Sequence, residues 1–225
     1  MSVVLARRYK RQGKREWGKT VQDGCDVKTS LYHVSQWSNG CWENGLCAEV
    51  SSSAPVRRPS STHRVAFGEW QESYDRFPYT YVKGLTDIDD VMSQVKGPQV
   101  LVVHDLMGED TEILQKWFTK KSHYHDTSVI YIVQNLFDKQ QRTISLNAHY
   151  LVLFKNPRDA SQIGALARQM YPSRSKYMQE AYEDATSTPR SYLLVDLKPD
   201  TPEALRLRSN ILPQEEPPIV YVQKV

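Results

Sequence analysis

The sequence has 225 residues, of which 40% are hydrophobic and 24% are charged, and its formal net charge is +3. This length suits one well-buried core or at most two small ones, and the composition excludes collagen, disulfide-rich miniproteins and wholly disordered chains. The small basic excess permits contact with nucleic acid and does not require it. No apolar run approaches the ~20 residues of a membrane span, and Met1–Arg15 lacks the apolar core of a secretory signal, so we expect a nuclear or cytoplasmic protein that is not secreted.

The first part of the chain differs in composition from the rest. Residues 1–66 contain all three cysteines and a basic cluster between Arg7 and Lys19, and they show no sustained helical or strand periodicity. The basic cluster is either a nuclear-localisation or nucleic-acid-binding patch or a solvated tail, and we favour the tail. Because Cys41 and Cys47 lack partners at zinc-site spacing, we expect no metal there. We therefore predict an irregular segment over residues 1–66.

From Phe67 onward, short apolar runs alternate with amphipathic stretches. This alternation is typical of α/β proteins, in which helices connect the parallel strands of a sheet. The expected elements are, in chain order, a strand at Tyr79–Val82, a helix at Ile88–Val95, a strand at Gln99–Val103, a helix at Glu109–Lys120, strands at Thr127–Val133 and Tyr150–Phe154, helices at Arg158–Met170 and Ser173–Ala185, and a strand at Tyr192–Leu197. We therefore predict an α/β domain with a mainly parallel sheet over residues 67–213, followed by a tail over residues 214–225.

Polar residues follow two of these strands at the point where each strand ends. Asp105 follows the apolar run Val100–Val103, where nucleoside triphosphatases carry a carboxylate that holds Mg²⁺. Gln134 follows Thr127–Val133 and is a candidate for sensing a γ-phosphate or positioning the attacking water. An aspartate that caps a turn and an amide that satisfies backbone groups are the alternative explanations.

Two arginines and two histidines are further candidates. Arg142 and Arg158 suit phosphate contact or an arginine finger offered to a neighbouring subunit, and ordinary surface or salt-bridging arginines are the alternative. His123 and His125 suggest a metal site, but a single His-x-His in a loop is more typical of solvated side chains. We therefore assign no metal to these two histidines.

Several segments together resemble one protein family. They are Gly68–Gln71, the strand ending in Asp105-Leu106-Met107, Ser128–Phe137, Arg142–Asp159 and Ala165–Pro172. These segments are similar to the genome-packaging ATPases of adenovirus and poxvirus type, within the FtsK/HerA class, as carried by Polinton (Maverick) transposable elements. The resemblance runs from about Phe67 to Pro213, and its most specific part is Tyr131–Phe137 followed by Thr143–Asn147.

This resemblance implies a RecA-like P-loop fold and ATP-driven translocation of double-stranded DNA by a ring of subunits. It implies ATP and Mg²⁺ as cofactors, with double-stranded DNA and further copies of the chain as partners. Asp105 would be the catalytic-site carboxylate and a Mg²⁺ ligand, and Gln134 a second catalytic-site residue. Arg142 and Arg158 would remain candidates for phosphate contact.

The chain departs from this family in two ways. The family needs a phosphate-binding loop, G-x-x-x-x-G-K-[ST], whose amides, lysine and hydroxyl hold the phosphates and Mg²⁺, and this pattern occurs nowhere in the sequence. The family also carries two adjacent acidic residues where this chain has His104-Asp105. His104 takes the place of the first carboxylate, and a neutral imidazole is a poor Mg²⁺ ligand. We expect this change alone to impair hydrolysis.

The genetic code suggests where the missing loop went. Trp37 has the single codon TGG, which gives a glycine when it is read one base forward, and Trp42 followed by Glu43 gives a second glycine five codons later. In the same frame, Glu43 into Asn44 gives Lys or Arg, and Asn44 into Gly45 gives Thr or Met. The shifted frame therefore contains G-x-x-x-x-G-[KR]-[TM], which includes the phosphate-binding pattern.

We hypothesise that the segment from before Leu31 to about Ala66 is an out-of-frame translation of the nucleotide-binding segment. A genuine, unrelated N-terminal region is the alternative. The coding DNA distinguishes them, because the strict hypothesis requires GAA for Glu43 and AAC for Asn44.

Three functions follow from the sequence. We prefer a catalytically inactive remnant of a DNA-packaging or DNA-translocating P-loop ATPase, a pseudoenzyme that binds neither ATP nor Mg²⁺. The first alternative is an active translocating ATPase that uses Asp105 and Gln134. The second is a non-catalytic nucleic-acid-binding or assembly module that uses the basic cluster between Arg7 and Lys19.

Overall fold

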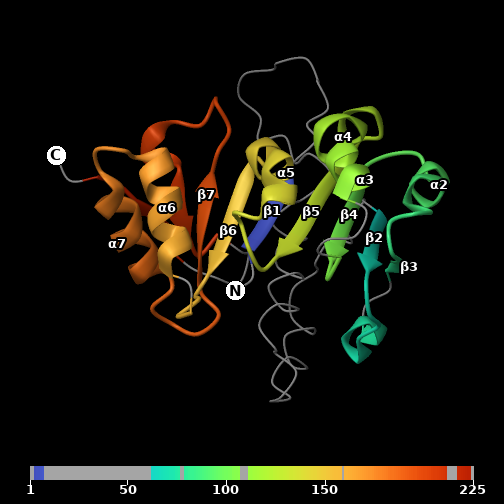
Figure 1. The fold of residues 1–225 in the computed structure, drawn as a ribbon, viewed down its shortest axis with the longest axis horizontal. Coiled ribbons are helices and arrows are strands. Elements are labelled where there is room, and N and C mark those ends of the chain that lie inside the picture. Colours follow the sequence, from blue (N-terminus) through green and yellow to red (C-terminus); the bar gives the residue numbers. More distant parts are fainter. Residues whose placement is uncertain are drawn as a thin grey trace. The chain divides into compact units, whose positions relative to one another are not determined.

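The computed structural model describes residues 3–7, 62–76, 79–106, 111–158, 160–211 and 217–223. These residues form an α/β fold (Figure 1), as the sequence predicts. The chain divides into two units, the first made of residues 8–129 and the second of residues 1–7 together with 130–225. Within the described ranges, no helix has the length and apolar character needed to cross a membrane.

The first unit is built on parallel strands. They are β2 (Thr62–Phe67), β3 (Thr80–Lys83) and β4 (Gln99–His104). Strand β2 pairs in parallel with β3 on one side and β4 on the other, so that Val65 lies opposite both Tyr81 and Val102. Strand β5 (Thr127–Val133) begins beside β4, where the backbone N–H of Gln99 donates to the carbonyl of Asp126 (3.1 Å), and continues into the second unit.

Helices connect these strands. They are the 3₁₀ helix η2 (Glu72–Arg76), α2 (Ile88–Ser93), α3 (Thr111–Lys116), the π-helix η3 (Trp117–Lys121) and α4 (Ser122–Tyr124). The sequence predicts a single helix over Glu109–Lys120, but the described part is broken by η3. There the N–H of Ser122 reaches the carbonyl of Trp117, and Trp117 and Phe118, which are adjacent in sequence, are both buried. In a regular α-helix adjacent residues point about 100° apart. The wider π-turn brings Trp117 and Phe118 closer to the same side of the helix, which helps to bury both rings.

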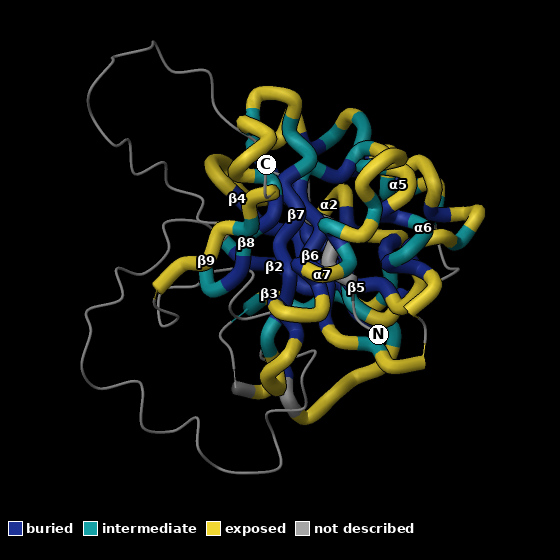
Figure 2. Tube along the Cα trace, turned by 90° about the vertical axis from the view of Figure 1, so that its left-hand side faces the viewer, coloured by how far each residue is buried: buried dark blue, intermediate teal, exposed yellow. Residues whose placement is uncertain are grey.

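The second unit is built on antiparallel strands. They are β1 (Val3–Arg7), β6 (Tyr150–Phe154), β7 (Tyr192–Asp196), β8 (Leu207–Ser209) and β9 (Ile219–Tyr221), in the order β1-β6-β7-β8-β9. Every described pairing among these five strands is antiparallel. Strands β6 and β7 are buried along their whole length (Figure 2).

The prediction of a mainly parallel sheet is therefore right for the first unit and wrong for the second. Two helices, α6 (Ala160–Met170) and α7 (Ser175–Ala185), lie between β6 and β7 and pack against each other. A single crossover helix brings the chain back to the end of the sheet at which the preceding strand began. A pair of antiparallel helices brings it back to the end at which that strand finished. The next strand must then run antiparallel to the one before.

The predicted irregular segment over residues 1–66 contains two described strands, β1 and most of β2. The predicted boundary between residues 66 and 67 falls inside β2. The polar pair His63-Arg64 interrupts the apolar pattern of this strand in the sequence, but both side chains are buried. Arg64 Nη1 donates to Gln99 Oε1 (2.6 Å), so the sheet accommodates this polar side chain through a neighbouring amide. The rest of the segment lies outside the described residues.

The second unit also holds short elements that periodicity does not predict. They are η4 (Lys139–Gln141), α5 (Arg142–Asn147), η5 (Glu203–Leu205), β8 and β9. Each has no more than six residues, which is too short for a reliable period. The predicted tail over residues 214–225 includes β9, so part of it is regular structure.

Candidate functional site

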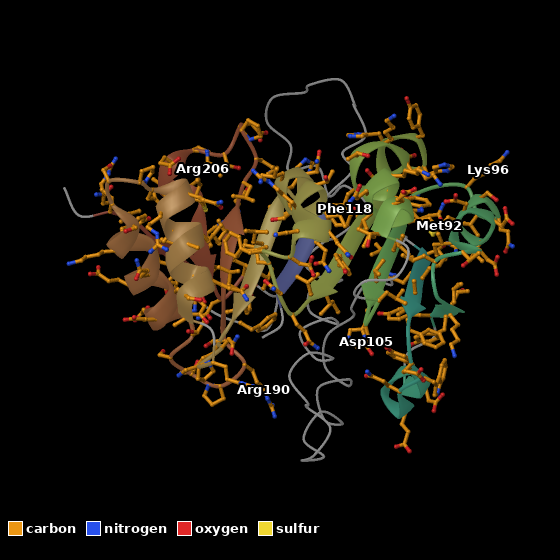
Figure 3. The ribbon with its side chains drawn as sticks, in the orientation of Figure 1. Met92, Lys96, Asp105, Phe118, Arg190 and Arg206 are labelled. Atoms are coloured by element: carbon orange, nitrogen blue, oxygen red, sulfur yellow. The ribbon has the colours of Figure 1, made fainter. Side chains whose placement is uncertain are left out.

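Asp105 lies where the sequence places it, at the carboxyl end of β4 (Figure 3). The four residues before His104 are buried, and Asp105 itself is exposed. Its backbone adopts a left-handed conformation with φ = 57°, which aspartate tolerates better than most residues. The left-handed turn ends the strand and places the carboxylate at its carboxyl edge. This edge is where ligands bind in parallel α/β sheets.

Gly68 fixes the backbone next to Asp105. It follows β2, and a Cβ atom at this position would collide with the carbonyl oxygen of Asp105. The obstructing atom belongs to the backbone, so it cannot move aside as a flexible side chain would. The two strand ends therefore approach each other closely only because residue 68 is glycine.

His104, the last residue of β4, is held by a tyrosine from η2. Its Nδ1 atom lies 2.7 Å from the hydroxyl oxygen of Tyr74, which is fully buried. The hydroxyl of Tyr81 in turn donates to the backbone carbonyl of Tyr74 (2.7 Å), and the two tyrosine rings stack with centroids 5.1 Å apart. The imidazole is thus part of a packed aromatic cluster, with one ring nitrogen already engaged.

Trp70 forms the outer side of this cluster. Its ring packs edge-to-face against Tyr74 and Tyr81, with both centroid distances 5.4 Å, and against Phe67 at 5.3 Å. Trp70 is still 52% exposed, so the cluster reaches solvent on this side. Aromatic pairs of this geometry each contribute about 0.5–1.5 kcal/mol beyond the area that they bury.

Burial controls the charge of the His104–Tyr74 pair. It lowers the pKa of His104, and the neighbouring Asp105 opposes this shift less strongly. It also raises the pKa of Tyr74, with smaller contributions from Asp105 and Tyr81. Both side chains are therefore neutral near pH 7, and Asp105 carries the charge at this strand end.

These residues do not fit a Mg²⁺–nucleotide site. Mg²⁺ prefers oxygen ligands, and in P-loop enzymes it is held by a carboxylate together with the hydroxyl of the phosphate-binding loop. Asp105 offers one carboxylate, His104 offers a nitrogen, and the sequence contains no such loop. Across the ranges that the structure describes, no group of three His, Cys, Asp or Glu side chains is placed to hold a metal ion.

The other predicted site residues belong to the second unit. Gln134 is exposed immediately after β5. The turn that follows is fixed by hydrogen bonds, because Phe137 N donates to Asn135 Oδ1 (2.9 Å) and Leu136 N donates to Gln162 Oε1 (3.1 Å). Arg142 is the first residue of α5 and is exposed. Gln134 therefore directly precedes a hydrogen-bonded turn, and Arg142 begins a short helix.

Arg158 lies in the turn after β6 and is also exposed. The turn is fixed to α7, because Asn156 N donates to the hydroxyl of Tyr182 (3.1 Å), which itself donates to the carbonyl of Phe154 (3.0 Å). A cavity of about 300 Å³ lies beside this turn, and Lys155, Asn156, Tyr182 and Glu183 are among its lining residues. Arg158 is not among them.

The chain matches no protein-family model. No curated protein and no solved structure is similar to it either. The resemblance to packaging ATPases therefore rests on the sequence segments alone and stays a prediction.

The sequence analysis identifies the strand end at Asp105 but not the groups packed around it. Gly68 and Trp70 fall in one of the segments that resemble the packaging ATPases, which is the only signal that singles them out. Tyr74 contacts a residue thirty positions further along the chain from a short 3₁₀ helix, and no periodicity connects the two. The pattern of apolar residues cannot show such a contact.

Proposed function

We propose that this chain is a catalytically inactive remnant of a DNA-packaging or DNA-translocating P-loop ATPase, with an incomplete RecA-like fold. The parallel order β3-β2-β4 and the position of Asp105 at the carboxyl end of β4 support the fold. The segments that resemble packaging ATPases support the ancestry. The observation that carries the loss of activity is the hydrogen bond between His104 and Tyr74 beside Asp105.

This hydrogen bond bears on activity because His104 stands at the position of the expected first carboxylate, and the bond ties its side chain to Tyr74. A half-buried, neutral imidazole bonded to a phenol supplies no negative charge and no oxygen ligand for Mg²⁺. Asp105 remains as a single carboxylate, and the sequence supplies no lysine in a phosphate-binding loop to balance the phosphates. In this proposal ATP and Mg²⁺ are cofactors of the ancestor and are not bound by this chain.

The position of β2 refines the frameshift hypothesis. Residues Thr62–Phe67, as translated, form the central strand of the first unit and pair with two neighbours. An out-of-frame segment would produce such a strand only by coincidence. We therefore propose that any out-of-frame segment ends before Thr62.

Nucleotide binding by the purified full chain tests this proposal. Isothermal titration calorimetry with Mg²⁺–ATP should show no saturable binding in the micromolar range, and phosphate release should stay at the background of the buffer. The matched variant is Asp105→Asn, which should change neither result. Micromolar ATP binding, or hydrolysis that Asp105→Asn abolishes, would establish the active ATPase instead.

Duplex DNA and further copies of the chain are the partners that we propose for the ancestor. Residual DNA binding is measured on the same preparation with a labelled duplex at about 50 and about 200 mM salt. The informative variant neutralises Lys10, Arg11, Lys14 and Arg15 together. A deletion of the first twenty residues is unsuitable because it also removes β1, which pairs with β6. Salt-sensitive binding that the neutralised variant loses would favour the nucleic-acid-binding module.

A further inference from the structure

The antiparallel sheet of the second unit ends at β9 with an exposed apolar edge. No described strand pairs with the outer side of β9. Ile219, Val220 and Val222 are 38%, 40% and 60% exposed. The run Ile219–Val222 is entirely β-branched or aromatic and contains no charged residue, and Pro217 and Pro218 directly precede it. Such an edge is suited to pair with another strand.

Helix α7 holds β9 in place for such pairing. The hydroxyl of Tyr177 donates to the carbonyl of Tyr221 (2.7 Å), and the hydroxyl of Tyr221 donates to Asp184 Oδ2 (2.7 Å). Arg174 also donates to the side chain of Gln223. Along the chain, residue 221 thus contacts residue 177 and residue 223 contacts residue 174, so β9 runs antiparallel to α7. A groove of about 670 Å³ lies between them.

The two ends of α7 carry opposite charge along this groove. Arg174 and Lys176 line its basic end, and Glu180 and Asp184 line its acidic end. All four side chains are exposed. The helix therefore presents a positive end and a negative end on the side that faces β9.

We propose that the outer edge of β9 pairs with β9 of a second copy of this chain, forming a symmetric dimer. Two identical edge strands that pair antiparallel are related by a twofold axis perpendicular to the sheet. That axis places both α7 helices on the same face of the joined sheet and makes them antiparallel. The basic end of each α7 then faces the acidic end of the other. This charge complementarity selects a second copy as the occupant, and the inference does not depend on the proposed function.

A pair of charge reversals tests this arrangement. Lys176→Glu places a carboxylate opposite the acidic end of the other α7, and Glu180→Lys places an ammonium group opposite its basic end. We expect the dimer dissociation constant of each variant alone to be at least about tenfold higher than that of the wild type. An equal mixture of the two variants should recover dimerisation, because only the mixed dimer restores opposite charges at both contacts. Sedimentation velocity of the full chain across the micromolar range measures these affinities.

The mixture separates the interface from effects within one helix. Lys176 and Glu180 lie four residues apart in α7, so each reversal also alters local helix stability. Mixing two folded proteins cannot repair a defect inside either of them. Lys116→Glu, on the exposed side of α3 in the first unit, is the control and should leave dimerisation unchanged. Val220→Lys places a charge on the edge strand and should also abolish the dimer.

The inference fails if the full chain is a monomer across the micromolar range, which would leave the edge to another protein. It also fails if the chain self-associates but the reversals have no effect, or if their mixture recovers nothing. A ring of the kind expected for packaging ATPases would sediment as a larger species, so it is distinguishable from the dimer.

Discussion

The two units bury polar groups in different ways. In the first unit, the buried Arg64 bonds to the neutral amide of Gln99, and burial lowers its pKa. In the second, the buried Asp196 lies 2.7 Å from Arg208 and accepts a hydrogen bond from the backbone of Lys198. A buried charge next to an opposite charge is compensated, whereas a buried charge next to an amide is compensated only in part.

The sheet edges of the two units differ as well. The strand ends β2 and β4 are packed tightly, with Gly68 against Asp105 and with His104 inside the aromatic cluster. The outer edge of β9 is exposed and apolar. The first arrangement leaves little room to change a residue without loss of stability. The second tolerates changes in the folded chain and is suited to contact with another one. Substitutions matched between the units measure this difference.

The largest expected effect is at Gly68. Gly68→Ala places a Cβ against the carbonyl oxygen of Asp105, and either β2 or β4 must shift to relieve it. We expect the free energy of unfolding to fall by about 2–4 kcal/mol. Denaturant titration followed by far-UV circular dichroism measures it.

Gly164→Ala in α6 of the second unit is the matched control. A Cβ there meets only the end of the Arg168 side chain, at 3.4 Å, which is flexible. Replacing a glycine inside a helix by alanine should stabilise the protein by up to about 1 kcal/mol. If the two substitutions had similar effects, the tight packing at the end of β4 would be disproved.

How far the sequence predicts this fold depends on how continuous each apolar run is. Thr127–Val133 and Tyr150–Phe154 are uninterrupted, and the structure gives both strands the predicted bounds. Strand β2 is missed because His63 and Arg64 are polar, and their burial depends on partners distant in the chain. The antiparallel direction of β7 relative to β6 is missed because the number of helices between the two strands, rather than the pattern of either strand, decides it.

The same limit applies to the candidate site. Asp105 is predictable because the end of a buried strand is visible in the sequence. Its environment depends on Gly68 and Tyr74, which come from other elements. Gln134, Arg142 and Arg158 are exposed as catalytic candidates would be, but exposure is also what the alternative of ordinary surface residues predicts. The sequence thus locates the strand ends and leaves the contacts around them open.

The next largest effect concerns Arg64. Gln99→Ala removes the carbonyl oxygen that accepts from Arg64 and the amide that donates to the carbonyls of Met92 (3.1 Å) and Val95 (2.9 Å). Arg64 Nε has no hydrogen-bond partner among the described residues, so the guanidinium depends strongly on this amide. We expect Gln99→Ala to lower the free energy of unfolding by about 2 kcal/mol or more.

Arg64→Met is the informative comparison because it removes the buried charge and keeps a side chain of similar length. We expect its stability to lie within about 1 kcal/mol of the wild type. The same denaturant titration gives both values. A large loss of unfolding free energy in Arg64→Met would show that the buried guanidinium itself stabilises the first unit. The amide of Gln99 would then compensate the buried charge as fully as Arg208 compensates Asp196.

The smallest expected effect is the pH dependence that His104 gives the first unit. The imidazole titrates near pH 6.5 in an unfolded chain, and burial lowers its pKa in the folded protein. Between these two pKa values the unfolded state binds more protons than the folded state. The contribution to stability is therefore complete above about pH 6.5 and is lost as the pH falls toward the folded pKa. Asp105 opposes the shift, which keeps the effect small.

Thermal unfolding between about pH 5 and pH 7.5 measures this dependence. His104→Gln keeps a polar side chain at the end of β4 and removes the titrating group, so its unfolding temperature should vary less with pH than that of the wild type. His123→Gln, at an exposed position in α4, is the control and should follow the wild-type profile. If His104→Gln kept the full acid sensitivity, the imidazole would not be the group that is forced to stay neutral. Another titrating group would then be responsible for the loss of stability in acid.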